Sequence, residues 1–222
     1  ATSNLTLKAE AETDAGGFVG NADTSSIVNL ASEPAPATVA VVLNGAISAE
    51  HVDIQANVLS MKIESFADSV AGGLGAGAYS TPTIRVDDVA SVQLNERAAV
   101  SGKTVEIAAD HRGINLHAKA MSDSNSLFAA GSAVAKADYV SESLVHAAAG
   151  SLVTAGNLTV KVDQSDVSYL RDGEFEKSVG EDRPAQKLGV FDAKRKIHWD
   201  GNISFITPVT PQLEVAANNT IT

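Results

Sequence analysis

One short pattern of alternating apolar and polar residues recurs along this chain at a nearly fixed spacing. The copies lie at residues 4–9, 51–56, 104–109 and 157–162. Their first apolar residues include Val52, Val105 and Leu158, which are 53 residues apart, whereas Leu5 precedes Val52 by 47. Alternation of this kind indicates a β-strand whose side chains point to opposite faces in turn. A fixed repeat of such strands constrains the fold more than any other feature of the sequence.

The residues around the pattern repeat with it. Ile47, Val100 and Val153 each precede the apolar residue by five positions, with a small residue between them. Segments 61–63 and 114–116 are also 53 residues apart. We therefore predict a solenoid in which equivalent strands of successive coils stack in parallel. Each period is expected to form roughly two coils of short strands, and Leu5 is expected to stack on Val52.

A sandwich or a propeller fits the pattern less well than a solenoid. Those folds join their strands through hairpin turns, for which Asn-Gly is the strongest signal. The chain has an Asn-Gly at Asn44–Gly45, and it does not join two long alternating strands. The glycine- and serine-rich stretches at residues 70–80 and 123–136 are interpreted as tight arcs of the coil.

Composition narrows the class of protein. Hydrophobic residues make up 44% of the chain but aromatic residues only 5%, which favours a narrow aliphatic core over one large globular core. The net charge of −11 argues against nucleic acid as a partner. The chain has no cysteine and no apolar run of the roughly 18 residues that a membrane helix requires. Because it begins at Ala1 directly before a strand pattern, we expect a piece of a longer exported protein.

The pattern changes near the C-terminal end. Residues 1–170 are expected to form the coils, residues 171–196 a protruding charged loop or hairpin, and residues 197–222 a return to the coils. The segment from 171 to 196 is dense in charges of both signs and contains several turn residues. A contact site for a partner is predicted there, on Arg171, Glu174, Glu176, Lys187, Lys194 and Arg195.

Few residues suggest chemistry. The five histidines lack the spacing of a metalloprotease motif. Weak calcium binding is considered at the acidic pairs Asp87/Asp88 and Asp163/Asp166, although adjacent strand residues point to opposite faces. A carbohydrate-active β-helix enzyme, a polysaccharide lyase or hydrolase, is the alternative reading, because such enzymes use converging carboxylates. We expect no catalytic residues and no cofactor other than calcium.

The C-terminal segment carries a resemblance to a known family. Residues 197–206 read Ile-x-Trp-x-x-x-Ile-x-Phe-Ile, and Pro-x-Leu-x-Val and Asn-x-Ile follow. This arrangement, together with Ala-Gly-Asn-Leu-Thr-Val at 155–160, resembles segments of giant bacterial β-strand-repeat surface adhesins, similar to filamentous haemagglutinin. The resemblance implies a right-handed parallel β-helix in an extracellular or cell-surface filament or stalk.

The expectation is thus an all-β, elongated, right-handed parallel β-helix with a structural and adhesive role rather than a catalytic one. Its partners would be neighbouring repeats of the same parent chain and, at the cell surface, host glycans or proteins. Neither nucleic acid nor a membrane span is expected.

Overall fold

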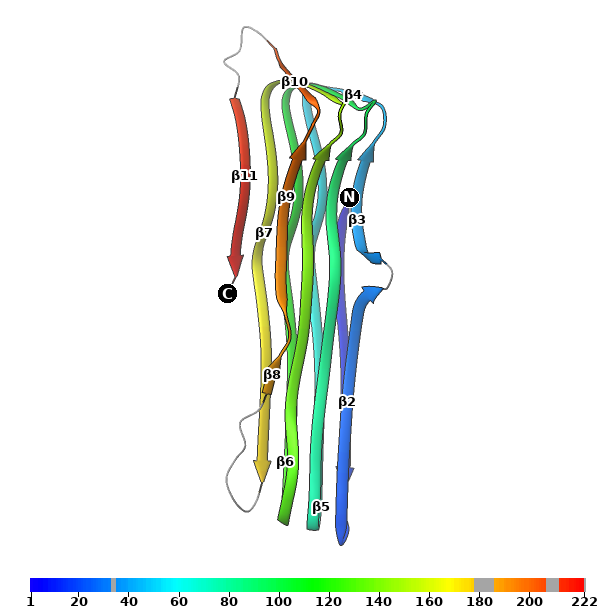
Figure 1. The fold of residues 1–222 in the computed structure, drawn as a ribbon, viewed down its shortest axis with the longest axis vertical. Coiled ribbons are helices and arrows are strands. Elements are labelled where there is room, and N and C mark those ends of the chain that lie inside the picture. Colours follow the sequence, from blue (N-terminus) through cyan, green and yellow to red (C-terminus); the bar gives the residue numbers. More distant parts are fainter. Residues whose placement is uncertain (33–34, 178–185, 207–211, 222) are drawn as a thin grey trace.

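The structure is a computed structural model whose backbone is described for residues 1–32, 35–177, 186–206 and 212–221. Its side chains are described for residues 1–30, 35–168, 170–171, 186 and 188–206. These residues form strands and turns, and the described part contains no helix, so the all-β class predicted from the alternation is confirmed. The molecule is elongated along its strands, which lie side by side and run parallel to its long axis (Figure 1).

Eleven strands belong to one sheet. They are β1 (Thr2–Ala15), β2 (Val19–Ser32), β3 (Ala35–Leu43), β4 (Ala46–Ser48), β5 (His51–Leu94), β6 (Ala99–Ala147), β7 (Leu152–Lys177), β8 (Gln186–Leu188), β9 (Phe191–Trp199), β10 (Asn202–Phe205) and β11 (Gln212–Ile221). Their pairings are parallel except for a short antiparallel contact between β2 and β3. The sheet is not closed.

The repeat period of the sequence equals the offset between paired residues of adjacent strands in the sheet. Val52 pairs with Val105 and Val105 with Leu158, and this offset of one full period holds along the pairing of β5 with β6. Met61 pairs with Ile114 at the same offset. The parallel stacking of equivalent positions predicted for these residues is therefore confirmed. Each period contributes one complete circuit of the chain to the stack.

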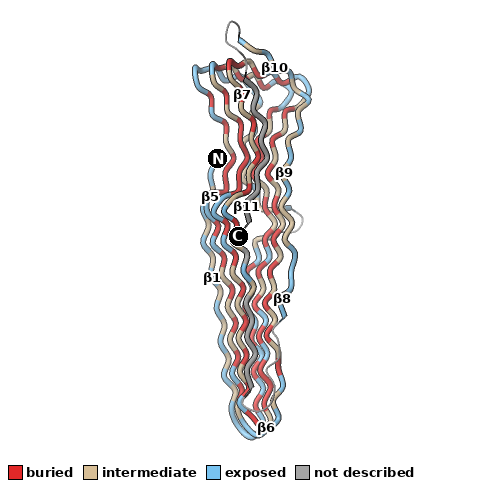
Figure 2. Tube along the Cα trace, turned by 90° about the vertical axis from the view of Figure 1, so that its left-hand side faces the viewer, coloured by how far each residue is buried: buried red, intermediate tan, exposed pale blue. Residues whose placement is uncertain are grey.

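Each circuit has two long walls that face one another and a short end strip. The first wall consists of β1, residues 51–72, 104–125 and 157–177, and β11; the second consists of β2, β3, residues 75–94 and 128–147, β8 and β9. The end strip consists of β4, residues 99–102 and 152–155, and β10. The long strands therefore reverse direction part-way: Ser69 and Ser80, on opposite walls, both hydrogen-bond Ser122. Figure 2 shows the two walls joined by narrow lower turns.

The core lies between the walls because inward and outward residues alternate. Val105, Ile107 and Ala109 are buried, and the intervening outward residues include Glu106. The aliphatic residues of both walls meet in two large clusters, an upper one around Val105 and a lower one around Ile114. Most buried residues are Ala, Val, Leu and Ile, so the core is thin and continuous along the stack (Figure 2).

The lower turn depends on one glycine. Gly73 adopts φ +146°, and an added Cβ would lie 2.3 Å from the carbonyl oxygen of Gly17 in the preceding circuit. We expect Gly73→Ala to lower the free energy of unfolding by more than about 1 kcal/mol, measured by urea denaturation. Gly72→Ala is the matched control, because its Cβ would meet nothing nearer than Asn125 O at 3.9 Å. Equal losses in the two variants would contradict this account of the turn.

Two details of the predicted repeat are wrong. One period forms one circuit of long strands instead of two coils of short strands, because the alternation continues without a break through most of each wall. Leu5 pairs with Met61 and not with Val52. The first circuit has a different length from the later ones, so the shorter spacing between Leu5 and Val52 does not mark equivalent positions.

The charge-dense segment also differs from its prediction. Residues 171–177 continue β7 and pair with residues 118–124, and residues 186–188 and 191–196 pair with β6. These residues therefore belong to the sheet and not to a protruding loop, because charged side chains are accommodated at the outward positions of a strand. The remainder of the predicted excursion, residues 178–185, lies outside the described residues.

Candidate functional site

A band of polar side chains crosses the interior between the two aliphatic clusters. Its members come from both walls and are buried: Asp88, His111, Ser141, Ser143 and Gln164. His111 occupies an inward position of β6, two residues after Ala109 and three before Ile114, which belong to different clusters. Burial of polar groups is costly unless they are hydrogen-bonded, so the partners of this band determine what it contributes.

Asp88, His111 and Ser143 form a connected row. The Nε2 atom of His111 lies 3.1 Å from Oδ2 of Asp88, and its Nδ1 atom lies 2.8 Å from Oγ of Ser143. The Ser143 hydroxyl is also 3.2 Å from the main-chain oxygen of Asp163, to which it can donate. Asp88 and Ser143 belong to the second wall and His111 to the first, so the row connects the two walls across the core.

Gln164 continues the band into the next circuit. Its Nε2 atom donates to Oγ of Ser141 and to the main-chain oxygen of Lys194, both at 3.2 Å. Arg195 pairs with Ser143 in the register of β6 with β9. Like Ala193 and Ile197, it lies at an inward-facing position of β9, where less exposed and exposed residues alternate. The band therefore extends from β5 to β9.

The row contains the residue types of a serine hydrolase triad, but its surroundings differ. In such enzymes, a histidine orients an exposed serine toward a substrate. Here the side chains of His111 and Asp88 are 0% and 4% exposed, and Ser143 is fully buried. A substrate would not reach the serine oxygen in this structure. The arrangement instead joins the two walls by directional hydrogen bonds.

A second polar band made of serines lies lower in the core. Ser65 donates to the main-chain oxygen of Ser26 at 2.9 Å, and Ser69 donates to Ser122 at 3.2 Å. Ser80 bonds Ser122 from the opposite wall at 2.6 Å. Small hydroxyl side chains thus bridge the walls where the interior holds few large aliphatic residues, and alanines fill the remaining positions below them.

Over the described residues, the four calcium candidates belong to no group of three or more ligands close enough to share an ion. Asp88 is buried against His111, whereas Asp87 lies on the outer face, as the strand alternation predicts. Asp163 stacks on Asp110 in the register of β6 with β7. Asp166 is exposed at φ +55°, at the bend position that Gly113 occupies in the preceding circuit at φ +60°. Its identity is explained by this bend, because aspartate tolerates the left-handed region better than most residues.

The residues predicted to contact a partner are scattered. Arg171 donates to the main-chain oxygen of Gly189 at 3.3 Å. Lys194 is exposed and pairs with Asp192 at 3.0 Å. Arg195 points inward, contrary to the prediction of an exposed contact, because it follows the inward parity of β9. The backbones of Glu174, Glu176 and Lys187 lie in β7 and β8, and their side chains lie outside the described residues.

A buried carboxylate on the first wall gives a pH dependence. Burial raises the pKa of Asp110 above its ordinary value, although Arg112 approaches its Oδ2 atom to 2.6 Å. Because the folded pKa exceeds the unfolded one, this group's contribution to stability is lost as the pH rises between those two values. Asp110→Asn should therefore flatten part of the decline in unfolding free energy as the pH rises above about 4, the ordinary pKa of an aspartate, measured by urea denaturation. An unchanged pH profile would contradict this prediction.

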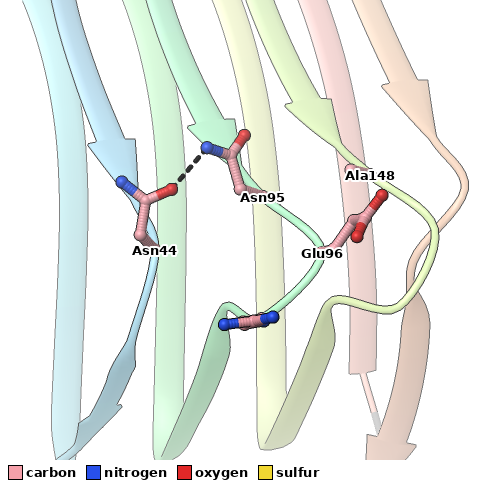
Figure 3. Close-up of a pocket in the computed structure, with 5 residues that line it drawn as sticks. Asn44, Asn95, Glu96 and Ala148 are labelled. Carbon is pink, nitrogen blue, oxygen red and sulfur yellow. Dashed lines mark hydrogen bonds between the residues drawn. The ribbon is translucent and has the colours of Figure 1, made fainter.

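The upper turns form a shallow pocket on the outside of the stack. It is lined by Asn44, Asn95, Glu96, Arg97 and Ala148. Asn95 donates its side-chain amide to the side-chain oxygen of Asn44 in the preceding circuit (Figure 3). In the later circuits, Ala148 and Asp200 hold the equivalent place, because their main-chain amides bond the strand end before them as that of Asn95 does.

Exposed apolar residues gather at the lower turns. Phe18 and Phe128 are 77% and 73% exposed. The main-chain oxygen of Phe18 accepts a hydrogen bond from Leu74 N at 3.0 Å, and Gly75 pairs with Phe128, so these residues lie in adjacent circuits. Leu74 and Leu127 are also exposed, so exposed apolar residues recur at this turn in successive circuits, and we call them the apolar edge. Exposed apolar residues that gather in one region are typical of contact surfaces.

Sequence reasoning missed the most connected residues of the interior. The inward orientation of His111, Ser143 and Gln164 could have been predicted from the alternation of the strands. His111, for example, lies an even number of residues after the inward-facing Val105 and Ile107. It also missed His146, His198 and Asp200, which are the one group of at least three candidate ligands close enough to share a metal within the part of the chain that the structure describes. The two histidines are separated in the chain by almost one full period.

In comparisons with known proteins, no family model, curated protein or solved structure matches the chain. Over the described residues, no helix is long and apolar enough to cross a membrane.

Proposed function

We propose that this chain is a non-catalytic structural and adhesive module of a large exported bacterial surface protein. Its folded-over sheet would be a right-handed parallel β-helix that forms part of a filament or stalk outside the cell. The observation that carries the proposal is the constant register of one period between β5, β6 and β7, which stacks successive circuits on one another around one shared core. An array of this kind lengthens by adding circuits, as a stalk requires.

The interior supports a structural role. The polar band hydrogen-bonds the walls to each other and draws its members from successive circuits, so that His111 and Gln164 each fix one register between facing strands. Apolar residues of the C-terminal segment that resembles the surface adhesins, Ile197, Trp199 and Phe205, pack against the upper aliphatic cluster. This segment therefore fits the same architecture as the repeats that precede it.

The adhesive part of the proposal is supported by the apolar edge at Phe18, Leu74, Leu127 and Phe128. These exposed apolar residues recur at the lower turns of successive circuits, on a module whose net charge of −11 otherwise favours a solvated surface. Host glycans or proteins are the partners that such a surface module would meet. Neighbouring repeats of the parent chain would pair with its open strand edges.

Surface labelling tests the proposal. Antibodies raised against the purified chain should label intact cells of the source organism, and protease treatment of intact cells should remove the label. A cytoplasmic protein probed in parallel controls for cell integrity. Labelling that requires permeabilised cells and resists external protease would overturn the proposed location, and with it the adhesive role.

A further inference from the structure

Three potential metal ligands meet at the upper, C-terminal corner of the stack. His146 lies near the end of β6 and His198 near the end of β9, where the two are paired residue to residue. Asp200 follows β9 directly and is fixed by a hydrogen bond from its main-chain amide to the oxygen of Ala147 at 2.8 Å. Residues almost one full period apart are thus held together by the register of the sheet.

The geometry of the three side chains is close to that of a ligand set. The imidazole rings of His146 and His198 have centroids 5.1 Å apart and are tilted by 51°. Nε2 of His198 lies 2.8 Å from Oδ2 of Asp200. One ligand atom from each residue lies within 4.8 Å of both others. In a tetrahedral zinc site, ligand atoms about 2 Å from the metal are separated by roughly 3.3 Å, so small side-chain rotations would close the set.

The side chains are free to make this adjustment. His198 and Asp200 are 63% and 53% exposed, and His146 is half-buried against the strand surface. We propose that His146, His198 and Asp200 form a binding site for a divalent transition-metal ion, with zinc as the representative ion. Two imidazole nitrogens and one carboxylate oxygen suit such borderline cations better than calcium, which takes six to eight oxygen ligands. Water would hold the remaining position.

The site has a structural consequence. A metal ion there would join the end of β6 to the end of β9 and to the turn that follows it, and so link two successive circuits outside their backbone hydrogen bonds. Because the metal binds the folded arrangement, it should raise the thermal midpoint of unfolding, and the stabilisation should grow with the logarithm of its concentration once that exceeds the dissociation constant. Protons compete for the imidazole nitrogens, so binding should weaken in acid.

Titration of the whole chain with Zn²⁺ by calorimetry, and with Co²⁺ by visible absorption, tests the site. The expected result is one ion per chain and a Co²⁺ spectrum with the strong d–d bands of four-coordinate cobalt. His146→Ala and His198→Ala should each weaken Zn²⁺ affinity at least about 10-fold, since even outer-sphere partners of metal ligands contribute that much. At one Zn²⁺ concentration, the thermal midpoint of the unchanged chain should rise more than that of either variant.

His51→Ala is the matched control, because His51 is also an exposed histidine on a strand of the same sheet. It should bind Zn²⁺ as the unchanged chain does. Circular dichroism of each variant without metal verifies that the sheet is intact. The proposal is overturned if the unchanged chain binds no Zn²⁺, or if His51→Ala weakens binding as much as His198→Ala, which would indicate dispersed binding to surface histidines.

Discussion

Replacing His111 with alanine should lower the free energy of unfolding by about 2–6 kcal/mol, because it leaves two buried polar groups without a partner at a cost of about 1–3 kcal/mol each. The substitution leaves the Asp88 carboxylate in the core without its 3.1 Å partner and Ser143 without its 2.8 Å partner. It also opens a cavity between the two aliphatic clusters. Urea denaturation followed by circular dichroism measures the loss directly.

The double variant Asp88→Ala/His111→Ala separates the interaction from the cavity. Once both partners are absent, no orphaned carboxylate remains, so the combined loss should be smaller than the sum of the two single losses. His51→Ala, on the exposed surface, should change stability by less than about 0.5 kcal/mol. A loss below about 1 kcal/mol for His111→Ala, or strictly additive losses in the cycle, would show that the polar band does not hold the walls together.

Replacing Ile114 with alanine should cost about 2–5 kcal/mol, the range for large-to-small substitutions in a close-packed core. Ile114 is fully buried and lies in a row with Leu5, Met61 and Val167 of neighbouring circuits. The cavity would therefore interrupt aliphatic contacts between several circuits at once. The same denaturation measurement applies.

Asn115→Ala provides the matched control for this prediction. Asn115 is the next residue of β6 but points to solvent, so its replacement should change the free energy of unfolding by less than about 0.5 kcal/mol. Similar losses at Ile114 and Asn115 would contradict the alternation of inward and outward side chains on which the core is built.

The register of the central circuits could be predicted from the sequence, because the repeat spacing and the alternation of inward and outward residues indicate the same pairing there. Val52, Val105 and Leu158 recur at the spacing of one period, and the structure pairs them. Leu5 could not be placed in this way, because Leu-Thr-Leu matches Val-Asp-Ile at residues 52–54 as well as Met-Lys-Ile at 61–63. Strand alternation has a period of two and leaves several registers with equally good patterns, so turn lengths decide among them.

The interior polar band was harder to predict than the aliphatic core. A histidine or glutamine at an inward position looks like an error in an alternating pattern until its partner on the facing wall is known. Ser143 lies 32 residues from His111, and Asp88 lies 23 residues before it. Such contacts follow from how the long strand folds back between its two walls, which the repeat alone does not specify. Charge density misled the prediction at residues 171–177, 186–188 and 191–196, since outward strand positions accept charges readily.

The same limitation applies to the proposed metal site. His146 and His198 are close because the chain completes one circuit between them. Their separation in the sequence becomes meaningful only when one period is known to form one complete circuit. With two coils per period, these histidines would lie two layers apart and could not share an ion.

Cross-linking across the sheet tests most directly whether one period of the repeat forms one circuit. The chain has no cysteine, so a pair introduced as Lys62→Cys and Asn115→Cys is unambiguous. These outward residues are partners in adjacent parallel strands, about 4.8 Å apart, which a disulfide can span. Lys62→Cys with His117→Cys, two residues out of register and about 8 Å apart, is the control. We expect rapid oxidation to an intramolecular disulfide in the first pair and not in the second; no disulfide in the first pair, or equal yields in both, would contradict the register.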